Sequence, residues 1–558
     1  MPAGAPSTQL TPPSEPMVWH GWGDPARRHG LPEAARAMLE RELGPLEGEH
    51  RPVPLSEVRV RPSALTAEQR RALEQVVGAA HVRDDHRTRV EHAGGRSTPD
   101  LLRRRHGDAT AAPDVVVAPR DHDEVAQVLD RCAEHRLAVV PFGGGTSVVG
   151  GVEPERGPFA ALVTLDLGRL DALIELDETA GLATFGAGVR GPAAEAALRE
   201  RGFTLGHFPQ SYAYLSLGGA VATRSSGQAS SGYGRIDELV AGLRCATPIG
   251  ELRIDHGPRS AAGPDLRALL LGSEGILGVL TEVTVRVRPA PELETYTAHV
   301  APSFASGAAT LRALAQAGAR ADVTRLSDED ETRAMLAQAG GWQTAALERY
   351  LGIRGVDTPS LLILGWEGSR EQVRRRRART RQVLATRRTV PIGAPAGRAW
   401  AAGRFDGPYL RDELLDRGVL VDTLETATSW SRLGALYQAV RGAVRTTLRG
   451  WGTPPLLLTH ISHLYPSGAS LYLTWLARQD TGRELEQWQA VKQATGDAIM
   501  AAGGTITHHH AVGLDHRRWM NDEVGPVGLA ALRAVKAALD PDGILNPGKL
   551  LPPDHGPA

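Results

Sequence analysis

Residues 141–151 read "PFGGGTSVVGG" and directly follow the apolar segment "LAVV". The consecutive glycines Gly143 to Gly145 allow the backbone to take positive φ angles and to approach a ligand closely. Successive N–H groups in such a loop can form a nest that binds an anion, and Thr146 and Ser147 add hydroxyl donors. The stretch is not a Walker loop, because no Gly-Lys-Ser/Thr triplet follows it. It predicts either a phosphate-binding loop or a plain glycine-rich turn.

The residues around this loop predict an alternation of strands and helices. The stretch "PDVVVAP" (113–119) is typical of a short β-branched strand, and apolar residues at helical spacing follow in 120–136. With "LAVVPF", the order strand, helix, strand indicates a right-handed β-α-β unit. Further short strands are expected up to Pro289 and Pro291. Two more strand–helix–strand sets in 292–500 predict a second sheet with helices on one side.

Composition excludes several classes of function. The chain has 558 residues, 42% hydrophobic and 23% charged, with a formal net charge of −1, which argues against bulk electrostatic binding to nucleic acid. The two cysteines, Cys132 and Cys245, suit a reducing compartment. Residues 1–16 lack the features of a signal peptide, and no apolar run reaches the roughly 18 residues of a membrane span. We therefore expect a cytoplasmic globular protein with a flexible N-terminal tail.

A second glycine pattern is an alternative candidate for nucleotide binding. Gly186, Gly188 and Gly191 in "FGAGVRG" form G-x-G-x-x-G between an expected strand and an expected helix. The acidic residue of a dinucleotide fingerprint is absent from the following strand region, "FTLGHFPQSY". The pattern favours a tight strand-to-helix turn.

Three segments together resemble the FAD-binding domain of the vanillyl-alcohol oxidase superfamily. They are "PDVVVAP…VVPFGGGTSV", "SLGGAVATRSSGQASSGYGRIDELV" (216–240) and "LLLGSEGILGVLTEVTVRVRP" (269–289). The resemblance implies non-covalently bound FAD. The cofactor-binding residues that it implies are Gly143, Gly144, Gly145, Thr146, Ser147, Val148, Val149, Gln210, Ser211, Ser216, Gly218, Gly219, Thr223, Arg224, Ser226, Glu274, Gly275, Ile276, Gly278, Val279 and Leu280.

The fold that this resemblance implies is an α+β, two-domain flavoprotein of the vanillyl-alcohol oxidase type. We expect an FAD-binding domain and an α+β cap domain that covers the flavin. The expected division is a flexible tail (1–16), an N-terminal helical segment (17–112), the FAD-binding domain (113–291), the cap or substrate domain (292–500) and a C-terminal segment that completes the active site (501–558).

The stretch "GGTITHHHAVG" (503–513) places His508, His509 and His510 in a row. Relatives that oxidise D-2-hydroxy acids hold a divalent metal with histidines and a carboxylate in two corresponding stretches. Here Tyr472 ends the first stretch, "THISHLYPSGASLYLTW", where histidine would stand, and His509 takes the place of the carboxylate. We therefore expect no bound metal.

The chain resembles instead the alkyldihydroxyacetonephosphate synthase family, from "VWHGWGD" near residue 18 to about residue 550. The resemblance implies that Tyr472 is a proton-transfer group and that Arg411, in "YLRD", binds the substrate phosphate. It places a further active-site arginine at Arg325 and a hydroxyl at Thr423. One departure is Gln210, which stands where the family has aspartate, and this puts one flavin-side contact in doubt.

The three histidines have three possible roles: metal ligands, packed core residues, or a polar cluster in the active site. Since consecutive residues of a strand alternate between faces, we expect His508 and His510 on one side and His509 on the other. The family resemblance favours an active-site cluster that transfers protons and binds phosphate. We expect His460 and His463, in "THISH", to be structural.

The implied reaction exchanges the acyl group of acyl-dihydroxyacetonephosphate for a fatty alcohol, with no net redox change and with an adduct at flavin N5. The alternative is an FAD-dependent oxidase or dehydrogenase of a 2-hydroxy acid or a related small alcohol. A third reading, a flavin-binding protein without catalysis, is disfavoured by Arg411 and Arg325. The implied partners are a lipid phosphate and a fatty alcohol, and no nucleic acid. Peripheral membrane contact and a homodimer remain open.

Overall fold

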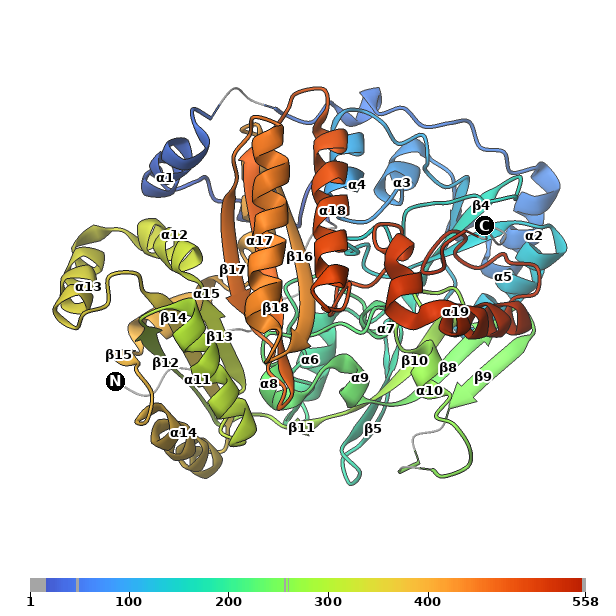
Figure 1. Cartoon of the computed structure of the whole chain (residues 1–558). Coiled ribbons are helices and arrows are strands. Elements are labelled where there is room, and N and C mark those ends of the chain that lie inside the picture. The colour runs from blue at the N-terminus through green and yellow to red at the C-terminus, as the bar shows by residue number, and fades with distance from the viewer. Residues whose placement is uncertain (1–16, 47–49, 255–256, 259, 554–558) are drawn as a thin grey trace.

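The computed structural model describes residues 17–46, 50–254, 257–258 and 260–553, so the tail expected at 1–16 lies outside the described residues. Two regions built around sheets lie side by side (Figure 1). The region at the right of the view contains the strands of residues 113–291, and the region at the left contains those of 292–500. The C-terminal helix returns to the first region.

The N-terminal segment, expected to be helical, also contains a strand. Its strand pairs with the first strand of the FAD-binding region, Val82 opposite Val117. The segment therefore extends that region's sheet. Its elements are η1 (Pro25–Arg27), α1 (Glu33–Leu43), η2 (Leu55–Glu57), α2 (Ala67–Val77), η3 (Ala79–His81), β1 (Val82–Arg83), α3 (His86–Glu91) and α4 (Thr98–Arg105).

The β-α-β unit is present, with one strand inserted. The four-stranded sheet has the order β1-β2-β4-β3, and both β2 and β3 run parallel to β4. Helix α5 begins after Asp121, whose side chain accepts the N–H of Glu124 at 2.9 Å. Its apolar face is fully buried in the core. The elements are β2 (Val115–Val117), α5 (His122–Glu134), β3 (Ala138–Phe142), β4 (Leu162–Asp166) and η4 (Leu167–Arg169).

A second, antiparallel sheet completes the FAD-binding region, in the order β5-β6-β10-β8-β9. The turn at Gly186–Gly191 joins β6 to α6, as the sequence favoured. A Cβ on Gly188 would lie 1.8 Å from the Leu167 carbonyl oxygen, so no side chain fits there. The elements are β5 (Leu173–Asp177), β6 (Leu182–Gly186), α6 (Gly191–Arg199), β7 (Phe203–Thr204), α7 (Leu217–Ala222), α8 (Ser230–Tyr233), α9 (Ile236–Leu239), β8 (Val240–Thr247), β9 (Gly250–Ile254), α10 (Arg267–Leu270), β10 (Val279–Arg286) and β11 (Arg288–Pro289).

The cap is a seven-stranded sheet in the order β15-β12-β14-β13-β17-β18-β16. Helices α11, α17 and α18 cover the face turned to the viewer in Figure 1. The elements are β12 (Leu293–Ala301), α11 (Phe304–Gln316), β13 (Val323–Ser327), α12 (Glu329–Ala339), α13 (Gly341–Ile353), β14 (Ser360–Gly368), α14 (Arg370–Leu384), β15 (Val390–Gly393), α15 (Pro395–Gly403), α16 (Gly407–Leu415), β16 (Val419–Ser429), α17 (Leu433–Gly450), β17 (Leu456–Ile461), β18 (Gly468–Arg478) and α18 (Glu484–Ala501).

The C-terminal segment corrects one expectation. Residues 508–510 form a series of bends, so the strand expected in "GGTITHHHAVG" is wrong. The Thr507 hydroxyl accepts the N–H of His510 at 3.1 Å, a local bond that competes with strand pairing, and Ala511 has a φ of 73°. After η5 (Arg517–Trp519), α19 (Met520–Leu539) packs on the FAD-binding region and bends at Gly525, next to Pro526.

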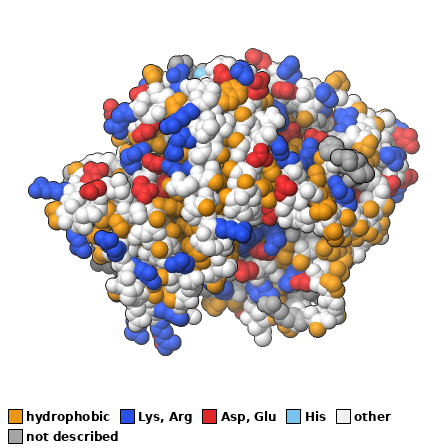
Figure 2. All heavy atoms as spheres, in the orientation of Figure 1, with side chains coloured by type: hydrophobic (Ala, Val, Ile, Leu, Met, Phe, Trp, Pro, Cys, Tyr) orange, Lys and Arg blue, Asp and Glu red, His pale blue; other side chains and the backbone are white. Residues whose placement is uncertain are grey.

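The surface fits the near-zero net charge. Acidic and basic side chains are interspersed on the face that Figure 2 shows. Among the described residues, the helices include none with the length and apolar character needed to cross a bilayer.

Candidate active site

The glycine loop packs against the segment before α7, as expected from the resemblance. A Cβ on Gly143 would lie 2.0 Å from Ser216 Oγ, and one on Gly144 would lie 2.1 Å from the Tyr214 carbonyl oxygen. Gly145 has a φ of 64°. Two of the predicted cofactor segments therefore meet, with space for backbone only.

The third cofactor segment is tied to the histidines through Glu274. Its buried carboxylate accepts the N–H groups of Val512 and Gly513 at 2.8 and 2.7 Å. Burial raises the pKa of Glu274 to about 7, and the two N–H bonds act in the opposite direction. The carboxylate therefore holds the histidine segment in place.

The other predicted cofactor residues differ in burial and in their hydrogen-bond partners. Ile276 is buried in the core, Arg224 is exposed and pairs with Asp237 at 2.8 Å, and Gln210 is exposed. The buried Ser226 hydroxyl has no hydrogen-bond partner in the described part of the chain. This hydroxyl and the glycine cradle fit a bound polar group such as FAD.

Tyr472 lies on β18 between two strands of the cap. Its register partners are Glu425 on β16 and His460 on β17. Burial raises the pKa of Tyr472 to about 12, while a hydrogen bond from Thr423 acts to lower it. The His460 ring stacks on the phenol at 4.7 Å, and the His510 ring meets it edge-on at 5.6 Å between centroids. The predicted residues Tyr472, Thr423 and His510 thus come together.

Arg325 reaches the phenol only through His460. Its Nη2 donates to Glu331 Oε1 at 2.8 Å and lies 2.9 Å from His460 Nδ1. His460 Nδ1 is also 3.0 Å from Glu331 Oε1. This network fixes the His460 ring against Tyr472, so His460 has a place in the site that its expected structural role did not include.

His508 and His509 meet at one buried carboxylate. His508 Nδ1 lies 3.5 Å from Glu425 Oε1, His509 Nδ1 directly contacts Glu425 Oε2, and His463 Nδ1 lies 3.5 Å from Oε1. Donor atoms of these four residues all lie within 4.8 Å of one another, a grouping that could hold a metal ion. The histidines hold the pKa of Glu425 well below its usual value despite burial.

The expected sides of the three histidines are therefore wrong. His508 and His509 share the Glu425 side, where their Nδ1 atoms lie 3.1 Å apart, and His510 turns to Tyr472. The reason is the bend at these residues, which removes the alternation of an extended strand.

Sequence reasoning missed Glu425 and assigned His463 to structure. A usable signal was present, because Thr423 and Glu425 are two residues apart on one strand and so face the same side. The contribution of His463 depends on the turn after β17, which the local pattern did not show.

Arg411, on α16, donates from Nη1 to the Arg96 carbonyl at 2.7 Å. Its Nε and Nη2 atoms are buried and lack hydrogen-bond partners among the residues that the structure describes. Burial lowers the pKa of Arg411, and the charges of Asp412 and Asp422 act in the opposite direction. Arg411 therefore offers two free donors to a ligand in this site.

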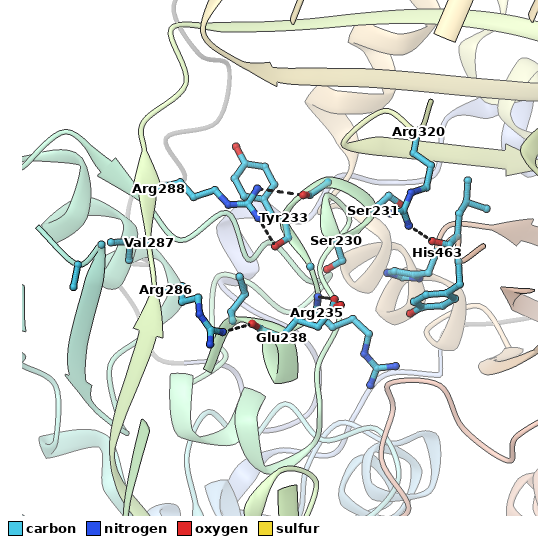
Figure 3. Close-up of a pocket in the computed structure, with 17 residues that line it drawn as sticks. Ser230, Ser231, Tyr233, Arg235, Glu238, Arg286, Val287, Arg288, Arg320 and His463 are labelled. Carbon is cyan, nitrogen blue, oxygen red and sulfur yellow. Dashed lines mark hydrogen bonds between the residues drawn. The ribbon is translucent and has the colours of Figure 1, made fainter. Parts of the chain in front are cut away.

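A basic cavity of about 450 Å³ lies beside the histidine cluster (Figure 3). Arg235, Arg286, Arg288 and Arg320 line it, together with His463. Its wall also contains Tyr465, whose hydroxyl lies 2.7 Å from His508 Nε2. Arg320 and Arg288 are held by backbone carbonyls, Arg320 by Leu464 at 2.6 Å. The cavity can admit an anionic group up to the edge of the cluster.

Comparisons with known proteins decide the family. Residues 113–255 match the family described as "FAD binding domain", and residues 290–550 match "FAD linked oxidases, C-terminal domain". The alkyldihydroxyacetonephosphate synthase of Dictyostelium discoideum is 31% identical, over 96% of this chain and 93% of its own. That of Trypanosoma brucei brucei is also 31% identical, over 97% and 94%. The chain belongs to the alkyldihydroxyacetonephosphate synthase family.

Solved structures agree with membership of the synthase family. An alkyldihydroxyacetonephosphate synthase structure superimposes with a TM-score of 0.83 at 29% identity, over 95% of this chain and 98% of that one. The p-cresol methylhydroxylase structure, at 16% identity and a TM-score of 0.67, shares the fold. The chain is an FAD-dependent enzyme of the synthase family with the two-domain fold that the sequence predicted.

Proposed function

We propose that the enzyme exchanges the acyl group of acyl-dihydroxyacetonephosphate for a fatty alcohol. The ester C–O bond breaks at the glycerone carbon, the fatty acid leaves, and the alcohol oxygen bonds to the same carbon, with no net gain or loss of electrons. The observation that carries the proposal is the meeting of Tyr472, Thr423 and His510 in a member of the synthase family.

The glycine cradle at Gly143–Gly145 and the Ser226 hydroxyl would hold FAD without a covalent bond. When bound, FAD would supply a flavin ring that can accept an electron pair from the substrate. No amino-acid side chain provides this chemistry. Acid precipitation of the purified yellow protein tests the non-covalent part, because the colour should then appear in the supernatant. Colour that stays with the pellet would show a covalent link.

Tyr472 and His510 together can move one proton. The pKa of about 12 keeps the phenol protonated at neutral pH, so Tyr472 donates or relays a proton. Burial lowers the pKa of His510 to about 4, which leaves its imidazole neutral and able to accept a proton. Their rings meet edge-on at 5.6 Å between centroids, and we assign the proton transfer to this pair.

Arg411 is the better of the two predicted phosphate ligands. Its Nε and Nη2 are free for a two-pronged contact with phosphate oxygens. Arg325 has one buried donor, Nε, without a partner among the described residues, but its Nη2 is engaged by Glu331 and His460, so we assign Arg325 to positioning His460.

We assign a shared proton, and no metal, to the Glu425 cluster. His509 Nδ1 directly contacts Glu425 Oε2, and the Ser462 hydroxyl lies 3.0 Å from His463 Nδ1, so these ring nitrogens have partners without an ion. Elemental analysis of the holoenzyme should find no stoichiometric metal, and EDTA should leave activity intact. Stoichiometric metal with EDTA-sensitive turnover would favour a 2-hydroxy-acid dehydrogenase instead.

One paired assay separates the two candidate functions. The enzyme is given acyl-dihydroxyacetonephosphate and a long-chain alcohol, and separately a series of D-2-hydroxy acids without oxygen. The proposal expects an ether product in the first reaction and no lasting loss of flavin colour in the second. Bleaching by a hydroxy acid without ether formation would support the oxidase or dehydrogenase.

The substrates also suggest where the enzyme works. Acyl lipids and fatty alcohols partition into membranes, so a cytoplasmic enzyme would reach them by peripheral contact with a bilayer. Flotation with lipid vesicles tests this contact, and sedimentation analysis tests the homodimer that the sequence left open. Small-molecule substrates require no nucleic acid.

A further inference from the structure

Three arginines, Arg96, Arg104 and Arg411, bind the carbonyl oxygens of Gly95 and Arg96. Arg96 and Arg104 are 3% and 1% exposed. The Gly95 carbonyl accepts from Arg96 Nη1 at 2.8 Å and from Arg104 Nη2, and the Arg96 carbonyl accepts from Arg411 Nη1 at 2.7 Å. The guanidinium groups come from the loop before α4, from α4 and from α16, yet they bind the carbonyl oxygens of two consecutive residues, Gly95 and Arg96.

Several of their donors remain unused. Arg96 Nε, Arg104 Nη1, and Nε and Nη2 of Arg411 are buried, and none has a hydrogen-bond partner within the described ranges. A guanidinium stays charged in proteins, and a buried charged donor without an acceptor is unfavourable. The donors therefore indicate that an acceptor from outside the described chain belongs here.

The nearby carboxylates do not accept hydrogen bonds from these unused guanidinium donors. Asp100 accepts the N–H of Gly95 at 2.9 Å, and Asp412 accepts that of Trp22 at 2.6 Å. The second oxygen of each carboxylate has no hydrogen-bond partner among the described residues, so neither oxygen binds the free guanidinium donors. Burial, followed by the charges of Arg104 and Arg411, lowers the pKa of Arg96, as expected when like charges are crowded.

The arginines have the cofactor loop on one side. The N–H of Arg96 donates to the Ser147 carbonyl at 2.6 Å, and a Cβ on Gly95 would lie 2.4 Å from the same oxygen. On the other side, the Thr98 hydroxyl at the start of α4 donates to Asp422 Oδ1 at 3.1 Å, and Asp422 precedes Thr423, the hydrogen-bond partner of Tyr472, on β16. The arginines therefore lie between the cofactor loop and the strand next to the phenol.

We propose that Arg96 and Arg104 form, with Arg411, a binding site for a phosphate monoester dianion. Three guanidinium groups suit this ligand, because each can direct N–H donors at phosphate oxygens. The N-terminal segment then supplies two of the three phosphate ligands. Assigning the phosphate to acyl-dihydroxyacetonephosphate rests on the proposed function, and the FAD diphosphate is the competing source of the same chemistry.

In the test, inorganic phosphate is titrated into the FAD-bound protein, and titration calorimetry measures its affinity. Arg96→Met and Arg104→Met should each weaken phosphate binding by about tenfold or more, the effect of losing hydrogen bonds to a charged group. The FAD content of both variants should stay at the wild-type level. Arg104→Lys, which keeps the charge and loses the planar fork, should lie between Arg104→Met and the wild type.

Arg87→Met is the matched control, since Arg87 lies exposed on the neighbouring α3 and should leave phosphate binding unchanged. Loss of FAD with unchanged phosphate affinity would assign the arginines to the cofactor and overturn the proposal. Unchanged affinity in both variants, or no phosphate binding by the wild type, would overturn it too. Because binding needs no turnover, a protein that binds phosphate in this way but makes no ether would refute only the proposed function.

Discussion

In the proposed reaction Tyr472 and His510 transfer the proton, and their contacts allow a direct test. Tyr472→Phe removes the phenolic proton and keeps the ring that stacks on His460. We expect Tyr472→Phe and His510→Ala each to keep FAD and to lose about 10²-fold in turnover, the scale of a lost proton-transfer group. Steady-state rates, normalised to bound flavin, measure the effect.

Thr428→Val is a useful comparison for these variants. It removes a hydroxyl farther along β16, where Thr428 is bonded to the Gly503 carbonyl at 2.8 Å and not to the phenol. Turnover of Thr428→Val should stay near the wild-type rate. If Tyr472→Phe were equally active, the phenol would have no part in proton transfer.

Glu274 makes a pH-dependent link between the cofactor segment and the histidine segment. Its pKa is about 7 in the folded state and about 4.3 when unfolded, so the folded state holds this proton more tightly. Its contribution to stability is complete below pH 4.3 and is lost as the pH rises through 7. The loss amounts to about 4 kcal/mol at high pH.

Glu274→Gln should remove this dependence. Relative to the wild type, the variant should gain unfolding free energy between pH 5 and pH 8, measured by denaturant unfolding of the FAD-bound proteins. Glu178→Gln, at an exposed turn, should show no such gain. A wild-type-to-variant difference that is equal at both pH values would contradict the raised pKa.

At the scale of elements, the glycine loop and the segment before α7 form one cradle. Gly144→Asp should abolish FAD binding, because its Cβ would lie 2.1 Å from the Tyr214 carbonyl oxygen and its carboxylate would repel a diphosphate. The flavin absorbance of the purified variant measures this. A folded Gly144→Asp variant with full flavin content would place the cofactor elsewhere.

The elements show where sequence reasoning succeeds. The β-branched run at Val115–Val117 and the apolar face of α5 predict their structures, because short-range patterns determine both. The histidine segment was predicted as a strand and is a series of bends. Here the Thr507 hydroxyl and the Glu274 carboxylate decide the backbone, and the second lies more than 200 residues away in the chain.

At the scale of the whole molecule, the site is assembled from four parts of the chain. Family resemblance predicted Tyr472, Thr423, His510 and Arg411, and the structure brings the first three together. Composition and spacing gave no role to Arg96 or Glu425, because their importance depends on contacts across more than 80 residues. Only the folded chain shows that the N-terminal segment contacts Arg411.

The central claim is that the alcohol replaces the acyl group at one carbon without net redox change. The most direct test supplies acyl-dihydroxyacetonephosphate and a long-chain alcohol whose hydroxyl oxygen carries a heavy isotope, and analyses the products by mass spectrometry. The account predicts an ether that retains the heavy oxygen, together with an equal amount of unlabelled fatty acid. An ether without the label, or no ether while a 2-hydroxy acid reduces the flavin, would contradict it.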